Sequence, residues 1–154
     1  MKRKTPENSR VDMTQIVLPQ HTNALGTIFG GVVLSWMDIA AAICAQKHCG
    51  RSVVTASIDA MNFLAPIHLG WVVYVTAHVN YTATTSCEVG IRITAENPQT
   101  GENHHTANAY VTMVAIDSNG RPTKIPPLVL ETEKEKQRFE EGKKRREKRL
   151  KQRK

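Results

Sequence analysis

The hydrophobic pattern changes once along the chain, from one long apolar segment to a series of alternating ones. Residues 30–46 read GGVVLSWMDIAAAICAQ, and Asp38 is the only charged residue among them. A helix that is apolar almost all the way round must be covered on several sides. We therefore predict a buried helix from about Gly31 to about His48, with Gly50 as its C-terminal stop.

After this helix the pattern becomes typical of β-strands. Four segments rich in β-branched and aromatic residues follow, namely VVTASIDAMNFL, WVVYVTAHVNYT, CEVGIRITAEN and HHTANAYVTMVAID. Apolar and polar positions alternate in them, and turn formers such as Asn119-Gly120 separate or follow them. A shorter strand, TQIVLP, precedes the helix and ends at Pro19. The pattern predicts an α+β domain in which a strongly curved antiparallel sheet wraps around one helix.

The two ends of the chain differ from its middle in charge. Residues 1–10 hold four Lys or Arg against one acid, and residues 131–154 hold twelve against six. The formal net charge of +7 therefore belongs to the ends, because residues 11–130 hold five basic and seven acidic side chains. We divide the chain into a basic polar leader (1–12), one folded domain (13–127) and a charged C-terminal extension (128–154) that is either helical or disordered and cannot anchor a core.

Composition excludes several functional classes. No segment approaches the roughly 18 apolar residues of a membrane span, and the first residues lack the apolar stretch of a signal peptide. The three cysteines follow no zinc-ligand or disulfide pattern, so we expect reduced thiols, no metal and a cytoplasmic location. No aromatic residue accompanies the basic ones after Phe139, which argues against a nucleic-acid partner.

Asp38 is the first candidate for chemistry. A carboxylate on an apolar helix is costly unless it is paired, neutralised or used in a reaction. A structural aspartate bonded to backbone amides or to a buried arginine would explain the position equally well. The residues around the helix must decide between these two interpretations.

The sequence before Asp38 favours catalysis. Gly30 and Gly31 stand at the predicted helix start, where unpaired backbone N–H groups at the positive end of the helix dipole can polarise a carbonyl oxygen. A side chain at either glycine would obstruct that approach. Asp38 could then attack the carbonyl itself or deprotonate a water, with Asn23 orienting the water or the carbonyl.

The segments NALGTIFGGVVLSWMD and VVTASIDAMNF resemble the hotdog-fold acyl-CoA thioesterases, in particular the bacterial short-chain enzymes and the mammalian cytosolic acyl-CoA hydrolases. The resemblance implies hydrolysis of acyl-CoA to a fatty acid and coenzyme A, without a further cofactor. It also implies a homodimer in which Asp38 and the facing protomer's Asn23 share each active site, and an assembly of three dimers into a hexamer. The mammalian enzymes have two such domains, whereas this chain carries both residues in one.

The same resemblance points to the place of coenzyme A. The turn containing Thr85 and Ser86 matches the family's contact with pantetheine or phosphate, and Arg121 and Lys124 are suitable phosphate partners. Acyl chain length depends on the apolar walls of the site, for which Trp36, Met37 and Phe63 are candidates.

Two other functions are possible on the same fold. A non-catalytic acyl-CoA sensor would bind its ligand without releasing free thiol, although no helix-turn-helix domain is attached. An acyl-thioester dehydratase would require a histidine near the helix start, where His21 is the nearby candidate.

Overall fold

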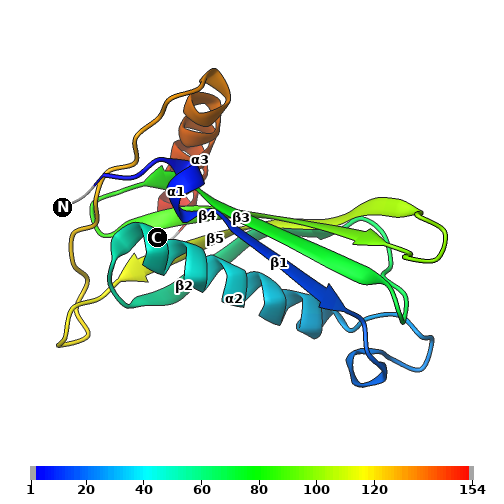
Figure 1. The fold of residues 1–154 in the computed structure, drawn as a ribbon. Helices are drawn as coiled ribbons and strands as arrows, with labels where there is room; N and C mark the ends of the chain where they lie inside the picture. The colour runs from blue at the N-terminus through cyan, green and yellow to red at the C-terminus, as the bar shows by residue number, and fades with distance from the viewer. Residues whose placement is uncertain (1–2, 153–154) are drawn as a thin grey trace.

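The computed structural model describes residues 3–152, which form one curved antiparallel sheet with a long helix on each face (Figure 1). The elements, in chain order, are α1 (Pro6–Ser9), β1 (Val11–Ile16), a short 3-10 turn (Pro19–His21), α2 (Gly30–Cys49), β2 (Val53–Phe63), β3 (Val72–Thr82), β4 (Ser86–Glu96), β5 (Asn103–Ala115) and α3 (Glu133–Gln152). The strand order is β1-β3-β4-β5-β2, so β1 and β2 are the two edges. The predicted α+β architecture and all four long strands are confirmed.

The core lies between α2 and the concave face of the sheet. Alternate residues of β3, β4 and β5 point toward the helix, and small residues on α2 let the layers approach closely. The fully or almost fully buried side chains of this layer include Met37, Ala41, Cys44, Val75, Val79, Val89, Ile93, Val111 and Met113. Gly50 ends α2 in the left-handed conformation (φ +66°), with its N–H donating to Gln46 O over 2.7 Å.

One side of α2 remains outside this core, contrary to the prediction of a buried helix. Ile39 and Ile43 are 50% and 42% exposed, and they continue the line of Gly31 and Ser35 at four-residue intervals. The sheet covers only the opposite side of the helix, because β2 ends the sheet there as an edge strand. A single chain therefore leaves an apolar stripe on α2, which we define as Gly31, Ser35, Ile39 and Ile43.

The N-terminal segment is part of the fold rather than a leader. Pro6 and Ser9 in α1 are buried, and Thr5 caps this helix by accepting the Asn8 N–H. The edge strand β1 starts at Val11, two residues before the predicted domain boundary, because its alternating residues pair with β3. Residues 1–2 lie outside the described part of the chain.

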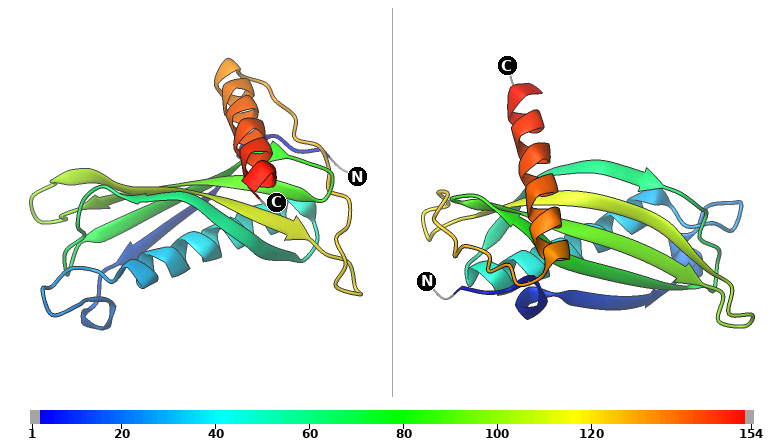
Figure 2. Two further views of the ribbon diagram at one scale, coloured as in Figure 1. Left: turned by 180° about the vertical axis from the view of Figure 1, so that it is seen from behind. Right: turned by 90° about the horizontal axis from the view of Figure 1, so that it is seen from above.

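The C-terminal extension forms an ordered helix on the convex face of the sheet, on the side opposite to α2 (Figure 2). Thr132 and Glu135 form a capping box, in which Glu135 N–H donates to Thr132 Oγ1 and Thr132 N–H to the Glu135 carboxylate. Glu135 therefore stabilises the helix start.

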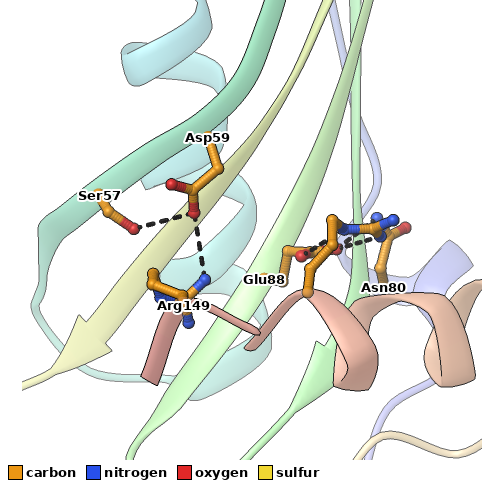
Figure 3. Close-up of polar contacts among 6 residues, drawn as sticks. Ser57, Asp59, Asn80, Glu88 and Arg149 are labelled. Carbon is orange, nitrogen blue, oxygen red and sulfur yellow. Dashed lines mark hydrogen bonds and ion pairs between the residues drawn. The ribbon is translucent and has the colours of Figure 1, made fainter. Parts of the chain in front are cut away.

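Both polar and aromatic contacts hold α3, and Figure 3 shows the polar ones. The Arg145 guanidinium donates to both oxygens of the buried Glu88 over 2.7 and 2.9 Å and lies 3.6 Å from the Tyr110 ring centroid. Arg149 pairs with Asp59 over 3.1 Å. The sequence left helix and disorder open for this segment, and the structure shows a helix held largely by polar residues on the convex face, which hydrophobic patterning does not reveal.

Within residues 3–152, no helix is long and apolar enough to cross a membrane.

Candidate active site

Asp38 lies at the boundary between the buried side of α2 and its exposed apolar stripe. It is partly exposed, with the exposed Ile39 on one side and the buried Met37 on the other. The prediction of a buried helix is therefore corrected at Asp38. In a single chain this carboxylate borders an open surface, where a substrate can reach it.

Thr55 on β2 is the side chain that positions Asp38. Its hydroxyl donates to Asp38 Oδ1 over 2.6 Å, the short distance expected for a hydroxyl donating to a carboxylate. Among residues 3–152, no donor contacts Asp38 Oδ2, so this oxygen can accept a proton from water. The sequence did not single out Thr55, although it lies in the segment VVTASIDAMNF and alternation placed it on one face of that strand.

The start of α2 offers the amide groups that the sequence predicted. Phe29 is the N-cap residue and provides no side-chain cap, and its carbonyl accepts from Val32 N and Val33 N. The N–H groups of Gly30 and Gly31 precede these bonds and have no helical acceptor. They are therefore available to a ligand oxygen.

The two glycines differ in their surroundings. A Cβ built on Gly30 would lie 3.4 Å from Cζ of Phe63, an ordinary contact, whereas nothing lies within 4 Å of a Cβ on Gly31. The packing of the described chain therefore does not require glycine at position 31.

Asn23 holds the loop that leads to this helix start. Its Oδ1 accepts from Leu25 N over 2.9 Å and from Thr27 N over 3.2 Å, and its Nδ2 donates to Thr27 Oγ1 over 2.9 Å. Asn23 thus precedes α2, whereas Asp38 lies eight residues into it, about 12 Å along the axis at 1.5 Å per residue. In one chain the amide groups and the carboxylate are too far apart to act on the same carbonyl.

A separate groove of about 510 Å³ lies near the turn between β3 and β4. Thr84, Lys124 and Arg146 line it, so the predicted Lys124 does lie beside this turn. Thr85 and Ser86 follow directly along the chain, and their backbone groups pair with the end of β5. Arg146 was missed because α3 was treated as a solvated segment.

Arg121 belongs to the next turn of the chain rather than to the lining of this groove. Its backbone N–H donates to Asp117 Oδ1 over 3.0 Å, and its carbonyl accepts from Asp117 N over 2.8 Å. These contacts order the turn, and the Arg121 side chain is exposed.

The cysteines are poor candidates for nucleophiles. All three are free and buried, and burial raises the pKa of the Cys44 thiol to about 12. No group of three or more His, Cys, Asp and Glu side chains within residues 3–152 could hold a metal ion. The carboxylate of Asp38 therefore remains the reactive group best placed beside an open surface.

The thioesterase superfamily profile matches residues 25–102, which contain α2, Asp38 and Thr55. The chain belongs to this superfamily. It is 41% identical over 137 residues to a Bacillus subtilis protein named as an uncharacterized acyl-CoA thioester hydrolase, covering 86% of this chain and 80% of that one. Human cytosolic acyl coenzyme A thioester hydrolase is 36% identical over 141 residues, but the match spans only 37% of its length.

Solved structures agree with this assignment. A hexameric acyl-CoA thioesterase has a TM-score of 0.93 at 41% identity, covering 98% of this chain and 97% of that one. The acyl-CoA hydrolase of Staphylococcus aureus, solved with butyryl coenzyme A and coenzyme A, has a TM-score of 0.91 at 36% identity, covering 99% and 93%. The predicted hotdog fold and the predicted family are both confirmed.

Proposed function

We infer that this protein hydrolyses acyl-CoA thioesters to a free carboxylic acid and coenzyme A, with Asp38 as the catalytic carboxylate. The observation that carries this proposal is the Thr55–Asp38 pair of 2.6 Å on the open side of α2. The S. aureus hydrolase supports it, because structures of that enzyme exist in which one aspartate, one asparagine or one threonine is replaced by alanine. Asp38, Asn23 and Thr55 are the same three residue types.

In the proposed reaction, the N–H groups of Gly30 and Gly31 bind the thioester carbonyl oxygen and stabilise the negative charge that develops on it. Asp38 removes a proton from water as the water oxygen attacks the carbonyl carbon, or attacks this carbon itself. The C–S bond then breaks, and the coenzyme A thiolate leaves and takes up a proton. Where Asp38 is the nucleophile, the acyl group remains on Asp38 as an anhydride, which water then hydrolyses to release the carboxylic acid. No further cofactor is needed for this hydrolysis.

The distance of about 12 Å along α2 between the helix start and Asp38 supports a site shared by two chains. The edge strand β2 is unpaired on its outer side, and an exposed edge of this length is suited to pairing with a second copy. Such pairing would bring the apolar stripes of two α2 helices together and place Asp38 of one chain beside the helix start and Asn23 of the other. A trimer of these dimers is supported by the similar hexameric thioesterase.

We place the phosphates of coenzyme A in the groove beside the β3–β4 turn, with Lys124 and Arg146 as cationic partners and Thr85 and Ser86 nearby. Arg121 contributes through its exposed side chain at the neighbouring turn. A cytoplasmic location is supported by the name of the human relative, cytosolic acyl coenzyme A thioester hydrolase.

Replacing Asp38 by Asn tests the proposal, because the amide keeps the shape and can still accept from Thr55 but cannot take a proton. We expect release of free thiol from acyl-CoA to fall by roughly 10²–10⁴-fold. Ser35→Ala, one turn earlier on the same helix, is the matched control and should retain activity. Thiol release by Asp38→Asn at the wild-type rate would contradict Asp38 as the catalytic carboxylate. Binding of acyl-CoA by the wild-type protein without thiol release would favour a non-catalytic sensor.

A further inference from the structure

An apolar pocket of about 270 Å³ opens beside the helix start that the proposed reaction uses. It is lined by Thr27, Ile28, Gly30, Phe63, Ala65, Pro66 and Ile67. Gly30 is therefore shared between this pocket and the amide groups assigned to the thioester carbonyl. The carbon chain attached to that carbonyl would therefore start at the mouth of the pocket.

Two irregularities in β2, the first between Thr55 and Ser57, precede Phe63 and together return it to the face of Thr55. The pairing with β5 advances three residues on β2, from Asp59 to Asn62, for two residues on β5, so β2 carries one extra residue there. Ala60 has φ +50°, a left-handed conformation that is uncommon outside glycine. A bulge of this kind reverses the alternation of side chains beyond it and re-aims them.

Beyond the second irregularity, the Phe63 ring lies against α2. Its Cζ atom lies 3.4 Å from the position that a Cβ on Gly30 would occupy, and the side chain remains 52% exposed. The ring therefore lies directly beside the helix start, with one side open. It forms a wall of the pocket without being fixed inside the core.

The other two candidates for such a wall lie in the interior instead. Met37 is completely buried in the core, and Trp36 is 6% exposed with its ring 5.3 Å from that of His21. Both belong to the packed layer under the sheet, where a change of volume is paid for in stability. Of Trp36, Met37 and Phe63, only Phe63 lines the pocket without being buried in the core.

We propose that this pocket holds the acyl chain of the thioester and that Phe63 limits the length of chain accepted. This inference rests on the proposed hydrolysis of acyl-CoA and names a specificity-determining residue for it. The pocket fits a saturated chain because Thr27 is the single residue of its lining with a polar side chain. A carbonyl bound at Gly30 and Gly31 would direct its first methylene groups toward the Phe63 ring.

The test compares kcat/KM for straight-chain acyl-CoAs from two to sixteen carbons in wild type, Phe63→Ala and Phe63→Trp. Removing the ring should raise the ratio of long-chain to short-chain kcat/KM by roughly tenfold or more, since one methylene in an apolar pocket changes discrimination by about 10–200-fold. Phe63→Trp should lower the same ratio, and it remains informative if the alanine variant folds poorly. Circular dichroism and the thermal midpoint report whether each variant is folded.

Leu64→Ala is the matched control, because Leu64 is the next residue, is 57% exposed and does not line the pocket. It should leave the chain-length profile unchanged. The assignment of Phe63 alone would be overturned if a Phe63 variant changed kcat/KM by the same factor for all chain lengths. It would also be overturned if Leu64→Ala shifted the chain-length profile as much as the Phe63 variants do. Failure of wild type to hydrolyse any acyl-CoA would instead overturn the proposed function, and this inference with it.

Discussion

At the scale of the residue, Gly31 is a glycine that the packing of its own chain does not require. A Cβ at this position would meet no atom within 4 Å, and the backbone φ is not in the left-handed region. Neither space nor conformation therefore demands glycine. An approaching substrate would require glycine here, because a methyl group beside the free amides would stand between them and a carbonyl oxygen.

Gly31→Ala should accordingly separate stability from activity. Alanine favours helix over glycine by up to about 1 kcal/mol, so the thermal midpoint should stay the same or rise. The kcat/KM for acyl-CoA should fall by roughly 10²-fold, the cost of misplacing a reacting group by about 1 Å. Wild-type kcat/KM in this variant would argue against the amides as the carbonyl-binding groups.

Gly26 provides the opposite control for this experiment. Its φ of +78° lies in the left-handed region, and no atom lies within 4 Å of a Cβ built on it. Gly26→Ala should cost about 1 kcal/mol of stability for conformational reasons alone.

At the scale of the element, α3 shows how a charged helix can be held without an apolar face. Glu88 is 4% exposed on β4, and its carboxylate would be expensive to bury without the two hydrogen bonds from Arg145. The small Gly142 allows the close approach, since a Cβ there would lie 2.8 Å from Cβ of Tyr81. Phe139 adds a ring contact with Tyr81 at 4.8 Å between centroids.

Arg145→Met should therefore lower the free energy of unfolding by about 3 kcal/mol, because it leaves the buried Glu88 charge without its partner. Urea unfolding measures this loss, and Glu88→Gln added to Arg145→Met should recover part of it. Lys148→Met, on an exposed position of the same helix, should change stability by less than about 0.5 kcal/mol. Equal midpoints for Arg145→Met and Lys148→Met would show that the ion pair does not hold α3.

At the scale of the whole molecule, the groups that we propose for the reaction do not meet within one chain. Asp38 borders the exposed stripe of α2, while the amides and Asn23 lie at one end of the same helix. An antiparallel arrangement of two α2 helices across paired β2 edges would unite these groups twice by symmetry.

Mixing two inactive variants tests this arrangement. Asp38→Ala and Asn23→Ala should each be inactive alone, but a heterodimer places both changes in one site and leaves the other intact. Unfolding and refolding them together at equal amounts should restore about a quarter of the wild-type activity per chain, because half of the dimers are mixed and each has one complete site. Absence of any recovery, with both variants folded and dimeric, would contradict a site shared between chains.

The sequence by itself determined the helix, the four long strands and the family, because side-chain periodicity and a dense motif are local properties of the chain. It also named Asp38, Asn23, Gly30 and Gly31 as candidates. It left helix and disorder open for α3 and treated the N-terminal segment as a polar leader, because their partners are polar or lie far away along the chain. Hydrophobic patterning carries no information about such contacts.

Only the tertiary structure decided which side chains meet. It placed Thr55 against Asp38 across seventeen residues of sequence and exposed one side of a helix that read as buried. It also turned Asp59 to the face opposite to that of Thr55, between two irregularities of β2 that alternation could not foresee, because one extra residue in a strand reverses the side chains after it. The chemistry of the site could be predicted from residue types, whereas its geometry follows from the pairing of strands.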